Sequence, residues 1–359
     1  MILAIVSLML WCAGWMVLGR IRPCGAGSGK TVNAGSISIV IPARNEEHNL
    51  PSLLGSLVAQ AAKPREIVVV DDSSTDRTGE IARQFGAHVI TSQPLPEGWR
   101  GKTWACQQGA QAATGETLLF LDADTRFEPD GFRQSIAEFE TLNAGVLSVA
   151  PHHAVRQFYE QFSAFFNLVM YSASTAFTLL GDRLPARGLF GPFVLIRRTD
   201  YDRVGGFASV KGRILETFYL AGKLRAAGVP LHCRSGRGVF SIRMYPHGCR
   251  DLVEGWTRGF ASGAGQTPVA MLLLLIGWMT GLMLPLTGLV LGGNPALWLG
   301  VYALCAMQVA WLMSRVGAFW LVTALVYPAP LIFYFVVFAR SAIRSGKPVA
   351  WKGREIRAD

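Results

Sequence analysis

Long apolar runs lie near both ends of the chain. They are Ile2 to Leu18, Val269 to Leu291, Ala296 to Met313 and Val316 to Ala339. A helix needs about 20 apolar residues to cross a bilayer, so each run is long enough, or nearly so, to span one. Two prolines in Pro328 to Pro330 interrupt the last run, which predicts a kinked or re-entrant helix there. The pattern predicts a protein held in a membrane at both ends.

Between these runs, short apolar segments alternate with longer segments of helical pattern. Strands that alternate with helices in this way form a doubly wound, mostly parallel sheet, so we predict a Rossmann-like α/β domain. In such a sheet, ligands bind at the carboxyl ends of the strands. The expected strands are Ile37 to Ile41, Glu66 to Val70, Leu118 to Leu121, Gly145 to Ala150 and Leu189 to Ile196; the expected helices are Glu46 to Gln60, Thr75 to Phe85, Ala105 to Ala113, Glu128 to Glu140 and Ile214 to about Gly228.

Polar motifs follow three of these strands directly. They are Pro42 to Glu46, Asp71 to Ser74, and the pair Asp122 and Asp124 in the stretch LLFLDAD. Because the carboxyl ends of parallel strands meet at one edge of a sheet, we expect the three motifs to lie together. Two carboxylates suit Mg²⁺ or Mn²⁺, which takes its other ligands from water and phosphate oxygens. In isolation, the aspartates fit a turn or a helix cap equally well.

Composition and charge agree with a membrane location. Hydrophobic residues make up 51% of the 359 residues, which is more than an ordinary soluble enzyme carries. The net charge is 34 − 24 = +10, and much of it lies beside the apolar runs. Arg20 and Arg22 follow the first run, which predicts a cytosolic C-terminal end for this anchor. The basic tail after Arg340 favours an anionic membrane surface over nucleic acid.

The motifs IVIPARNEE, VVVDDSSTDRT and LDAD, in that order, resemble the nucleotide-sugar domain of family-2 glycosyltransferases of the GT-A fold. The resemblance implies a UDP-sugar donor and a Mg²⁺ or Mn²⁺ cofactor. It implies that Asp72 holds the uracil and that Asp124, with Asp122, carries the metal and the diphosphate. It also implies a nucleoside pocket lined by Pro42, Ala43, Arg44 and Glu46.

Two further residues are candidates on the chemistry of their side chains. We expect Lys102 to lie in a glycine-containing loop, from which its point charge can reach a phosphate. His153 follows a predicted strand next to His152, and neighbours on an extended chain point to opposite sides. We therefore consider His153 alone as a contact to the acceptor, with ordinary polar packing as the alternative.

The pair Glu216 and Thr217 stands where inverting members of the resembled family usually carry Glu-Asp, with the aspartate as catalytic base. Glu216 is then the candidate base, or a carboxylate that merely favours a helix start. An alcohol acceptor needs a base to remove its proton, whereas a carboxylic acid is already ionised at neutral pH. A threonine in place of the family's aspartate therefore permits a carboxylate acceptor.

The segments YEQFSAFFN, LFGPF and RMYP…EGWTRGFASGA resemble the 4,4'-diaponeurosporenoate glycosyltransferases of carotenoid synthesis, with hopanoid-associated glycosyltransferases as similar enzymes. The Gln-x-x-Arg-Trp motif of processive family members is missing. In an enzyme of this kind, Trp256 closes over the sugar and Arg258 pairs with the diphosphate or an acceptor carboxylate. Plain packing of Trp256 against membrane helices is the alternative.

Together these features predict a membrane-bound inverting glycosyltransferase with its catalytic domain on the cytoplasmic side of the plasma membrane. The expected acceptor is a carotenoid carboxylate, glucosylated from UDP-glucose. The alternatives are a hopanoid, polyprenyl-phosphate or diacylglycerol acceptor, or a non-catalytic protein that binds or transports lipid. The expected domains are an anchor over 1–19, a linker over 20–35, a GT-A domain over 36–264 with interfacial helices over 158–180, membrane helices over 265–340 and a basic tail over 341–359.

Overall fold

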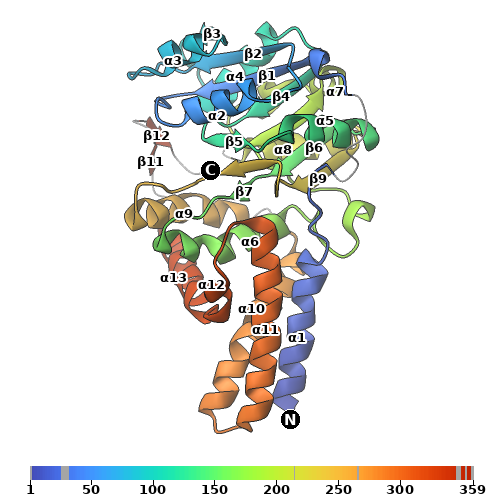
Figure 1. Ribbon diagram of the computed structural model, residues 1–359, viewed down its shortest axis with the longest axis vertical. Coiled ribbons are helices and arrows are strands. Elements are labelled where there is room, and N and C mark those ends of the chain that lie inside the picture. Colours follow the sequence, from blue (N-terminus) through green and yellow to red (C-terminus); the bar gives the residue numbers. More distant parts are fainter. Residues whose placement is uncertain are drawn as a thin grey trace. The chain divides into compact units, whose positions relative to one another are not determined.

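The computed structural model describes residues 2–25, 32–213, 215–264, 267–344, 349–351 and 354–356 (Figure 1). The chain divides into two compact units, and each is described by itself. The sheet unit comprises residues 23–152, 185–243 and 348–359. The helical unit comprises residues 1–22, 153–184 and 244–347.

The sheet unit is built on a seven-stranded sheet in the order β3-β2-β1-β4-β8-β6-β9. All neighbouring strands are parallel except β8, which runs antiparallel to both β4 and β6. The predicted α/β fold with a mostly parallel sheet is therefore confirmed. The strands are β1 Ile37–Ala43, β2 Glu66–Asp71, β3 His88–Thr91, β4 Thr117–Leu121, β6 Val146–Ala150, β8 Phe193–Arg197 and β9 Leu231–Ser235.

The strands are buried because their side chains are apolar on both faces, as a sheet covered by helices requires. The covering helices are α2 Leu50–Val58, α3 Thr78–Gln84, α4 Gly101–Ala112, α5 Gly131–Thr141, α7 Arg198–Arg203 and α8 Glu216–Ala226, with the short 3₁₀ helices η1 Ala34–Ser36 and η4 Gly206–Val210. A second sheet has the order β5-β10-β7, with bounds Thr125–Phe127, Phe240–Ile242 and His152–His153.

Helices α2, α3, α5 and α8 begin two to four residues later than the sequence predicts. Helix α4 begins earlier, at Gly101, so Lys102 is in a helix and not in the predicted loop. Helix α2 starts at Leu50 rather than Glu46, and α3 starts at Thr78 rather than Thr75. The residues before each helix are polar, and their side chains bond to loop backbone instead of allowing a helical turn. For example, Asp76 Oδ2 accepts from the Glu47 N–H at 3.1 Å. The polar turns thus lengthen the loops at the carboxyl ends of β1 and β2.

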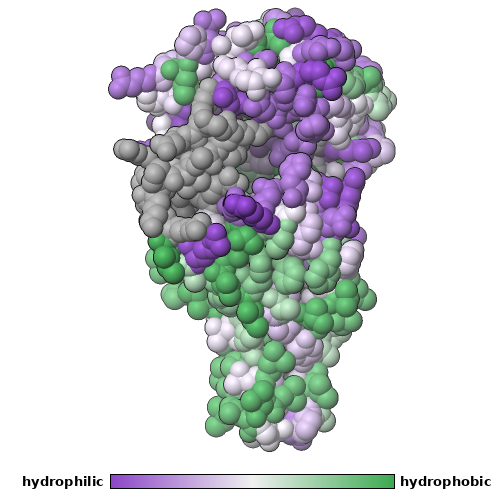
Figure 2. All heavy atoms as spheres, turned by 90° about the vertical axis from the view of Figure 1, so that its left-hand side faces the viewer, coloured by the Kyte–Doolittle hydropathy of each residue, from purple (hydrophilic) through white to green (hydrophobic). Residues whose placement is uncertain are grey.

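In the helical unit, three helices run side by side (Figure 1): α1 Ile2–Leu18, α10 Val269–Val290 and α11 Pro295–Val316. Polar side chains join them, because Ser7 Oγ donates to Gly281 O at 3.0 Å and Trp278 Nε1 donates to Gln308 Oε1 at 2.8 Å. Helices α10 and α11 are long and apolar enough to cross a membrane, and α1 is a shorter apolar helix of 17 residues. Apolar side chains cover much of the outside of this unit (Figure 2).

The other helices of this unit are η2 Phe158–Ser163, α6 Ala164–Ala173, η3 Gly181–Arg183, α9 Cys249–Ala264, α12 Leu321–Leu325 and α13 Pro328–Arg344. The run from Val316 to Ala339 is therefore not one long helix, which corrects the expectation of a spanning segment there. It breaks before Pro328, since proline disfavours a helical conformation in the residue that precedes it.

The segments expected to be linker and tail are described in part. Pro23 forms a bridge with Ser235, and the Cys24 N–H donates to Ser235 O at 2.8 Å, so the chain is fixed against β9 before residue 26. Residues 26–31 lie outside the described part. In the tail, β11 Val349–Trp351 pairs with β12 Arg354–Ile356, and the other residues after 344 lie outside the described part.

Candidate active site

The three polar motifs lie at one edge of the main sheet, as predicted. Strand β1 stands between β2 and β4, and Ala43 at the end of β1 is in register with Asp71 at the end of β2. All three strands run in the same direction, so their carboxyl ends open onto the same edge. This edge carries the loop after Ala43, the loop after Asp71 and the pair Asp122 and Asp124. Together these residues form the active-site rim.

Asp72 is held by both neighbouring loops. Its N–H donates to Ala43 O at 2.8 Å, and Arg44 Nη1 donates to its backbone oxygen at 2.6 Å. Only 7% of the residue is exposed. These bonds fix the backbone of Asp72, and a buried carboxylate at this position suits a ligand that offers N–H donors, such as the edge of a nucleobase.

The β1 and β2 loops are bonded to each other through Asn45. This residue and Ser73 both have left-handed backbone conformations, with φ of 52° and 56°. The Asn45 N–H donates to Ser74 Oγ at 3.0 Å, and Asn45 Oδ1 accepts from the Thr75 N–H at 2.8 Å. The sequence pattern did not indicate this role, although asparagine tolerates the left-handed region better than most residues. The two loops are therefore bonded to each other within the active-site rim.

Negative charge accumulates around Asp124. Burial, followed by the nearby carboxylates of Asp122 and Glu46, raises the pKa of Asp124 to about 7. The Asp122 backbone is fixed by two bonds, since its N–H donates to Pro192 O at 3.2 Å and its carbonyl accepts from Thr125 Oγ1 at 2.6 Å. Three carboxyl groups from two loops thus interact electrostatically at this rim, which favours a cation between them.

Lys102, near the start of α4, supplies one such cation. Its Nζ lies 2.5 Å from Asp122 Oδ1 and 3.8 Å from Glu216 Oε1. Burial lowers the pKa of Lys102, but the carboxylates of Asp122 and Glu216 outweigh burial, so the pKa lies above its usual value. Lys102 is therefore protonated and joins the proposed metal ligand to the candidate base.

Glu216 is the first residue of α8, and its side chain is 13% exposed. Burial raises its pKa above the ordinary value, whereas the positive charge of Lys102 lowers it. Arg100, whose role no sequence motif indicates, also lowers the pKa of Glu216 and donates from Nε to Gly212 O at 2.8 Å. Glu216 thus lies among cations at the rim, in a position suited to proton transfer.

Thr217, at the position where a Glu-Asp pair would carry the aspartate, has a structural role. It is buried, and its Oγ1 donates to Leu189 O at 3.0 Å. A threonine hydroxyl has no proton-accepting role at neutral pH comparable to that of a carboxylate. Among the Glu216–Thr217 pair, only Glu216 can serve as a base.

Replacing Thr217 with valine tests this assignment. The variant leaves Leu189 O without its buried donor, so we expect a loss of about 1–2 kcal/mol in the free energy of unfolding. Catalytic turnover should stay within about twofold of the parent protein, because the hydroxyl takes no part in the reaction. Chemical denaturation and turnover, measured on the same preparation, check both expectations. A large loss of turnover in a variant of unchanged stability would contradict them.

The residues at the rim fit a divalent metal that takes only some of its ligands from the protein. In the described part of the chain, no group of three or more His, Cys, Asp or Glu residues is close enough to hold a metal by itself. Asp122 and Asp124 offer hard oxygen atoms, and the pKa of Asp124 is raised first by burial and then by the neighbouring negative charges, which a cation would neutralise. This set suits a Mg²⁺ or Mn²⁺ ion that takes its remaining ligands from a diphosphate and water.

The residues expected on the acceptor side belong to the helical unit. His153 is buried, and its backbone oxygen accepts from the Ala318 N–H at 2.8 Å. Trp256 stacks on Phe166 with ring centroids 4.7 Å apart, and its Nε1 donates to Ser163 Oγ at 3.0 Å. These contacts favour the packing alternative for Trp256. The side chain of Arg258 lies outside the described part.

An α/β sheet that gathers buried carboxylates and a lysine at the carboxyl ends of its strands agrees with a glycosyltransferase of the GT-A fold. Sequence comparison agrees, because the family described as Glycosyl transferase family 2 matches residues 38–205. The chain belongs to this family and is a glycosyltransferase.

Curated relatives extend the similarity to nearly the whole chain. The 4,4'-diaponeurosporenoate glycosyltransferase of Staphylococcus aureus strain MRSA252 is 32% identical over 99% of this chain and 96% of its own length. The enzyme of strain N315 is 31% identical over the same shares. Among solved structures, the mannosyltransferase PcManGT from Pyrobaculum calidifontis, in complex with GDP-Man and Mn²⁺, is similar in fold. Its TM-score is 0.50 and its identity 18%, over 95% of this chain and 98% of that one.

Proposed function

We propose that this glycosyltransferase moves glucose from UDP-glucose to the carboxylate of a membrane-dissolved carotenoid acid, giving a β-glucosyl ester. One observation carries the choice of acceptor: Thr217 is bonded to Leu189 O and supplies no carboxylate where related inverting enzymes use one. A carboxylic acid acceptor needs no base, because it is ionised at neutral pH. The name of the relatives that match 99% of this chain supports the same acceptor class.

In the proposed reaction, the rim binds the donor and neutralises the leaving group. Asp72 accepts from the uracil, and Pro42, Ala43, Arg44 and Glu46 line the nucleoside pocket. Asp122 and Asp124 would hold the metal ion, which would supply positive charge to stabilise the departing UDP.

Lys102 adds a second positive charge close to the diphosphate. Its Nζ already lies within ion-pair distance of Asp122 and Glu216. The acceptor carboxylate attacks the anomeric carbon directly, so the configuration inverts. With an alcohol acceptor, Glu216 would have to take the proton.

The membrane arrangement that we propose follows from the helices of the helical unit. Helices α1, α10 and α11 cross the bilayer, and α10 and α11 together return the chain to the side from which it left. Helix α13 has only 17 residues, and its Ser341 Oγ donates to Thr257 O on α9 at 2.7 Å. An interfacial α13 leaves the basic tail on the cytoplasmic side, in agreement with the positive-inside rule.

Transfer assays with the purified full-length chain test the proposed function. With Mn²⁺ and UDP-glucose, a C30 carotenoid carboxylic acid should be converted to an ester that mild alkali hydrolyses. The rate should change little above about pH 7, where Asp124 is ionised and the acceptor is already ionised. The matched control acceptor is the alcohol obtained by reducing the same acid, which should react at least about tenfold more slowly.

Parallel assays separate the alternatives. Hopanoid, polyprenyl-phosphate and diacylglycerol acceptors replace the carotenoid, and GDP-mannose replaces the donor. Faster transfer to any of these lipids would overturn the proposed acceptor while keeping the enzyme class. Metal-independent binding of the lipids without release of UDP would favour a lipid-binding or transport protein instead.

A further inference from the structure

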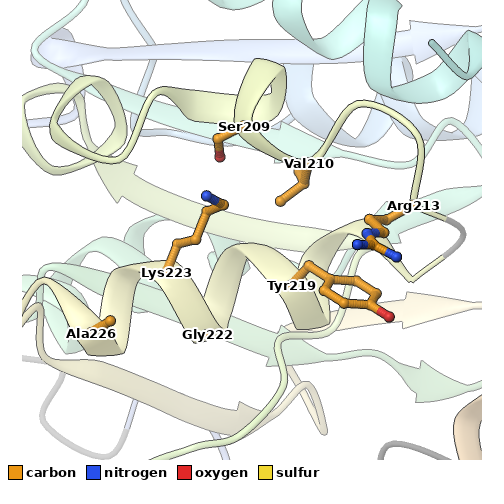
Figure 3. Close-up of a pocket in the computed structure, with 7 residues that line it drawn as sticks. All are labelled: Ser209, Val210, Arg213, Tyr219, Gly222, Lys223 and Ala226. Atoms are coloured by element: carbon orange, nitrogen blue, oxygen red, sulfur yellow. The ribbon is translucent and has the colours of Figure 1, made fainter. Parts of the chain in front are cut away.

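A cavity of about 390 Å³ lies in the sheet unit between α8 and the segment that includes η4 (Figure 3). Its volume falls within the range of small-molecule pockets. Lys223 extends from α8 toward the segment that carries Ser209 and Val210, while Arg213 lies beside Tyr219 (Figure 3). None of the rim residues described above lines this cavity.

The charged side chains that line the cavity are all positive. Arg213 and Lys223 are the charged residues among those that line it, and none of the lining residues is acidic. Among the residues that the structure describes, neither cation forms an ion pair with a carboxylate. Two cations that share a cavity without a carboxylate partner favour an anionic ligand.

The guanidinium of Arg213 is positioned by an aromatic ring. Its Cζ lies 4.6 Å from the centroid of the Tyr219 ring. Stacking occupies the face of the guanidinium and leaves its in-plane N–H groups available, and those groups match the oxygens of a phosphate. A lysine ammonium adds a second, flexible charge.

A glycine on α8 keeps the cavity open. Gly222 lines the cavity, and a Cβ placed on this residue would meet no atom within 4 Å. A larger side chain here would extend into open space rather than into the protein. The helix itself does not require glycine, because Gly222 has no positive φ.

The cavity wall is connected to the active-site rim through backbone. Gly212, next to Arg213, accepts from Arg100 Nε at 2.8 Å. Arg100 immediately precedes α4, which carries Lys102, and α8 itself begins with Glu216. A ligand that orders the loop around Arg213 therefore also orders residues next to the rim.

We propose that this cavity is an accessory site for a phosphate group, distinct from the donor site and adjacent to the catalytic helix α8. The phosphate belongs either to a soluble phosphate ester or to the headgroup of an anionic phospholipid. Its occupant holds the loop over 211–213, and with it Arg100, in the position seen in the structure.

Binding measurements on the full-length chain test the site independently of sugar transfer. The probes are glycerol 3-phosphate, titrated by calorimetry in phosphatidylcholine nanodiscs, and phosphatidylglycerol, detected by native mass spectrometry of the protein taken from mixed-lipid nanodiscs. Two variants alter the cavity: Arg213→Ala removes the stacked cation, and Gly222→Leu fills the space while leaving both charges. Arg225→Ala is the matched control, because this residue is on the same helix outside the cavity.

Each result has a defined meaning. Saturable binding of glycerol 3-phosphate that weakens at least about tenfold in both cavity variants, and not in the control, supports the site with a soluble ester as occupant. Retention of phosphatidylglycerol that is lost in the same two variants supports it with a lipid headgroup.

Binding of neither probe, or equal weakening in Arg225→Ala, overturns the proposal. Thermal unfolding midpoints confirm that Gly222→Leu is folded, since replacing glycine within a helix favours the helix. Because no donor or acceptor is present, failure here leaves the proposed transfer reaction untouched.

Discussion

Replacing Asp124 with asparagine is expected to lower kcat/KM for sugar transfer by at least about 100-fold, which corresponds to about 2.7 kcal/mol of transition-state stabilisation. The amide keeps the shape of the side chain but loses the anionic oxygen that the metal requires. It also removes one of the charges that Asp122 and Glu46 oppose, so the folded protein should be no less stable. Steady-state transfer at several Mn²⁺ concentrations, with thermal unfolding on the same samples, measures both effects.

Asp130→Asn provides the matched control for this variant. Asp130 pairs with Arg133 near the start of α5 and has a left-handed backbone with φ of 61°, which asparagine adopts readily. The Asp130→Asn variant should retain full transfer activity. Equal activity in the Asp124 and Asp130 variants would remove Asp124 from the reaction.

Replacing Lys102 with methionine is expected to raise KM for the donor and to lower kcat/KM by about 10- to 100-fold. Methionine keeps most of the apolar length of the side chain but leaves Asp122 and Glu216 without their shared cation. Since Lys102 lowers the pKa of Glu216, its loss should raise that pKa further. If an acceptor that needs a base is used, the acidic limb of the pH profile should then move to higher pH. Full pH profiles with acid and alcohol acceptors measure the shift.

Lys63→Met is the control for the loss of a lysine charge. Lys63 is exposed and donates to Val58 O at 2.6 Å, away from the polar motifs at the strand ends. The control should leave both KM and the pH profile unchanged. An unchanged donor KM in the Lys102 variant would contradict a role of this lysine at the diphosphate.

The sequence predicted the position of the rim because that position depends on local pattern alone. An apolar strand that ends in polar residues identifies its own carboxyl end, and parallel strands bring such ends together. The predicted gathering of Asp72 and Asp122 at one edge therefore needed no information about side-chain contacts. The same reasoning predicted the break near Pro328, since proline acts on the residue that precedes it.

Contacts between distant segments could not be predicted in this way. The ion pair of Lys102 with Glu216 joins residues that are 114 positions apart, and no local pattern indicates it. Strand β8 begins at Phe193 rather than Leu189 because the preceding carbonyls have other partners. Leu189 O accepts from Thr217, and Pro192 O accepts from the Asp122 N–H. Such bonds exist only after the chain has folded.

The bonds around Asn45 have a consequence for the thermodynamics of donor binding. A flexible loop must be ordered when a nucleotide binds, and the lost conformational entropy weakens the affinity. Here Asn45 joins Ser74 and Thr75 in the ligand-free protein. The nucleoside pocket is therefore preorganised, so that more of the contact energy with the donor appears as affinity.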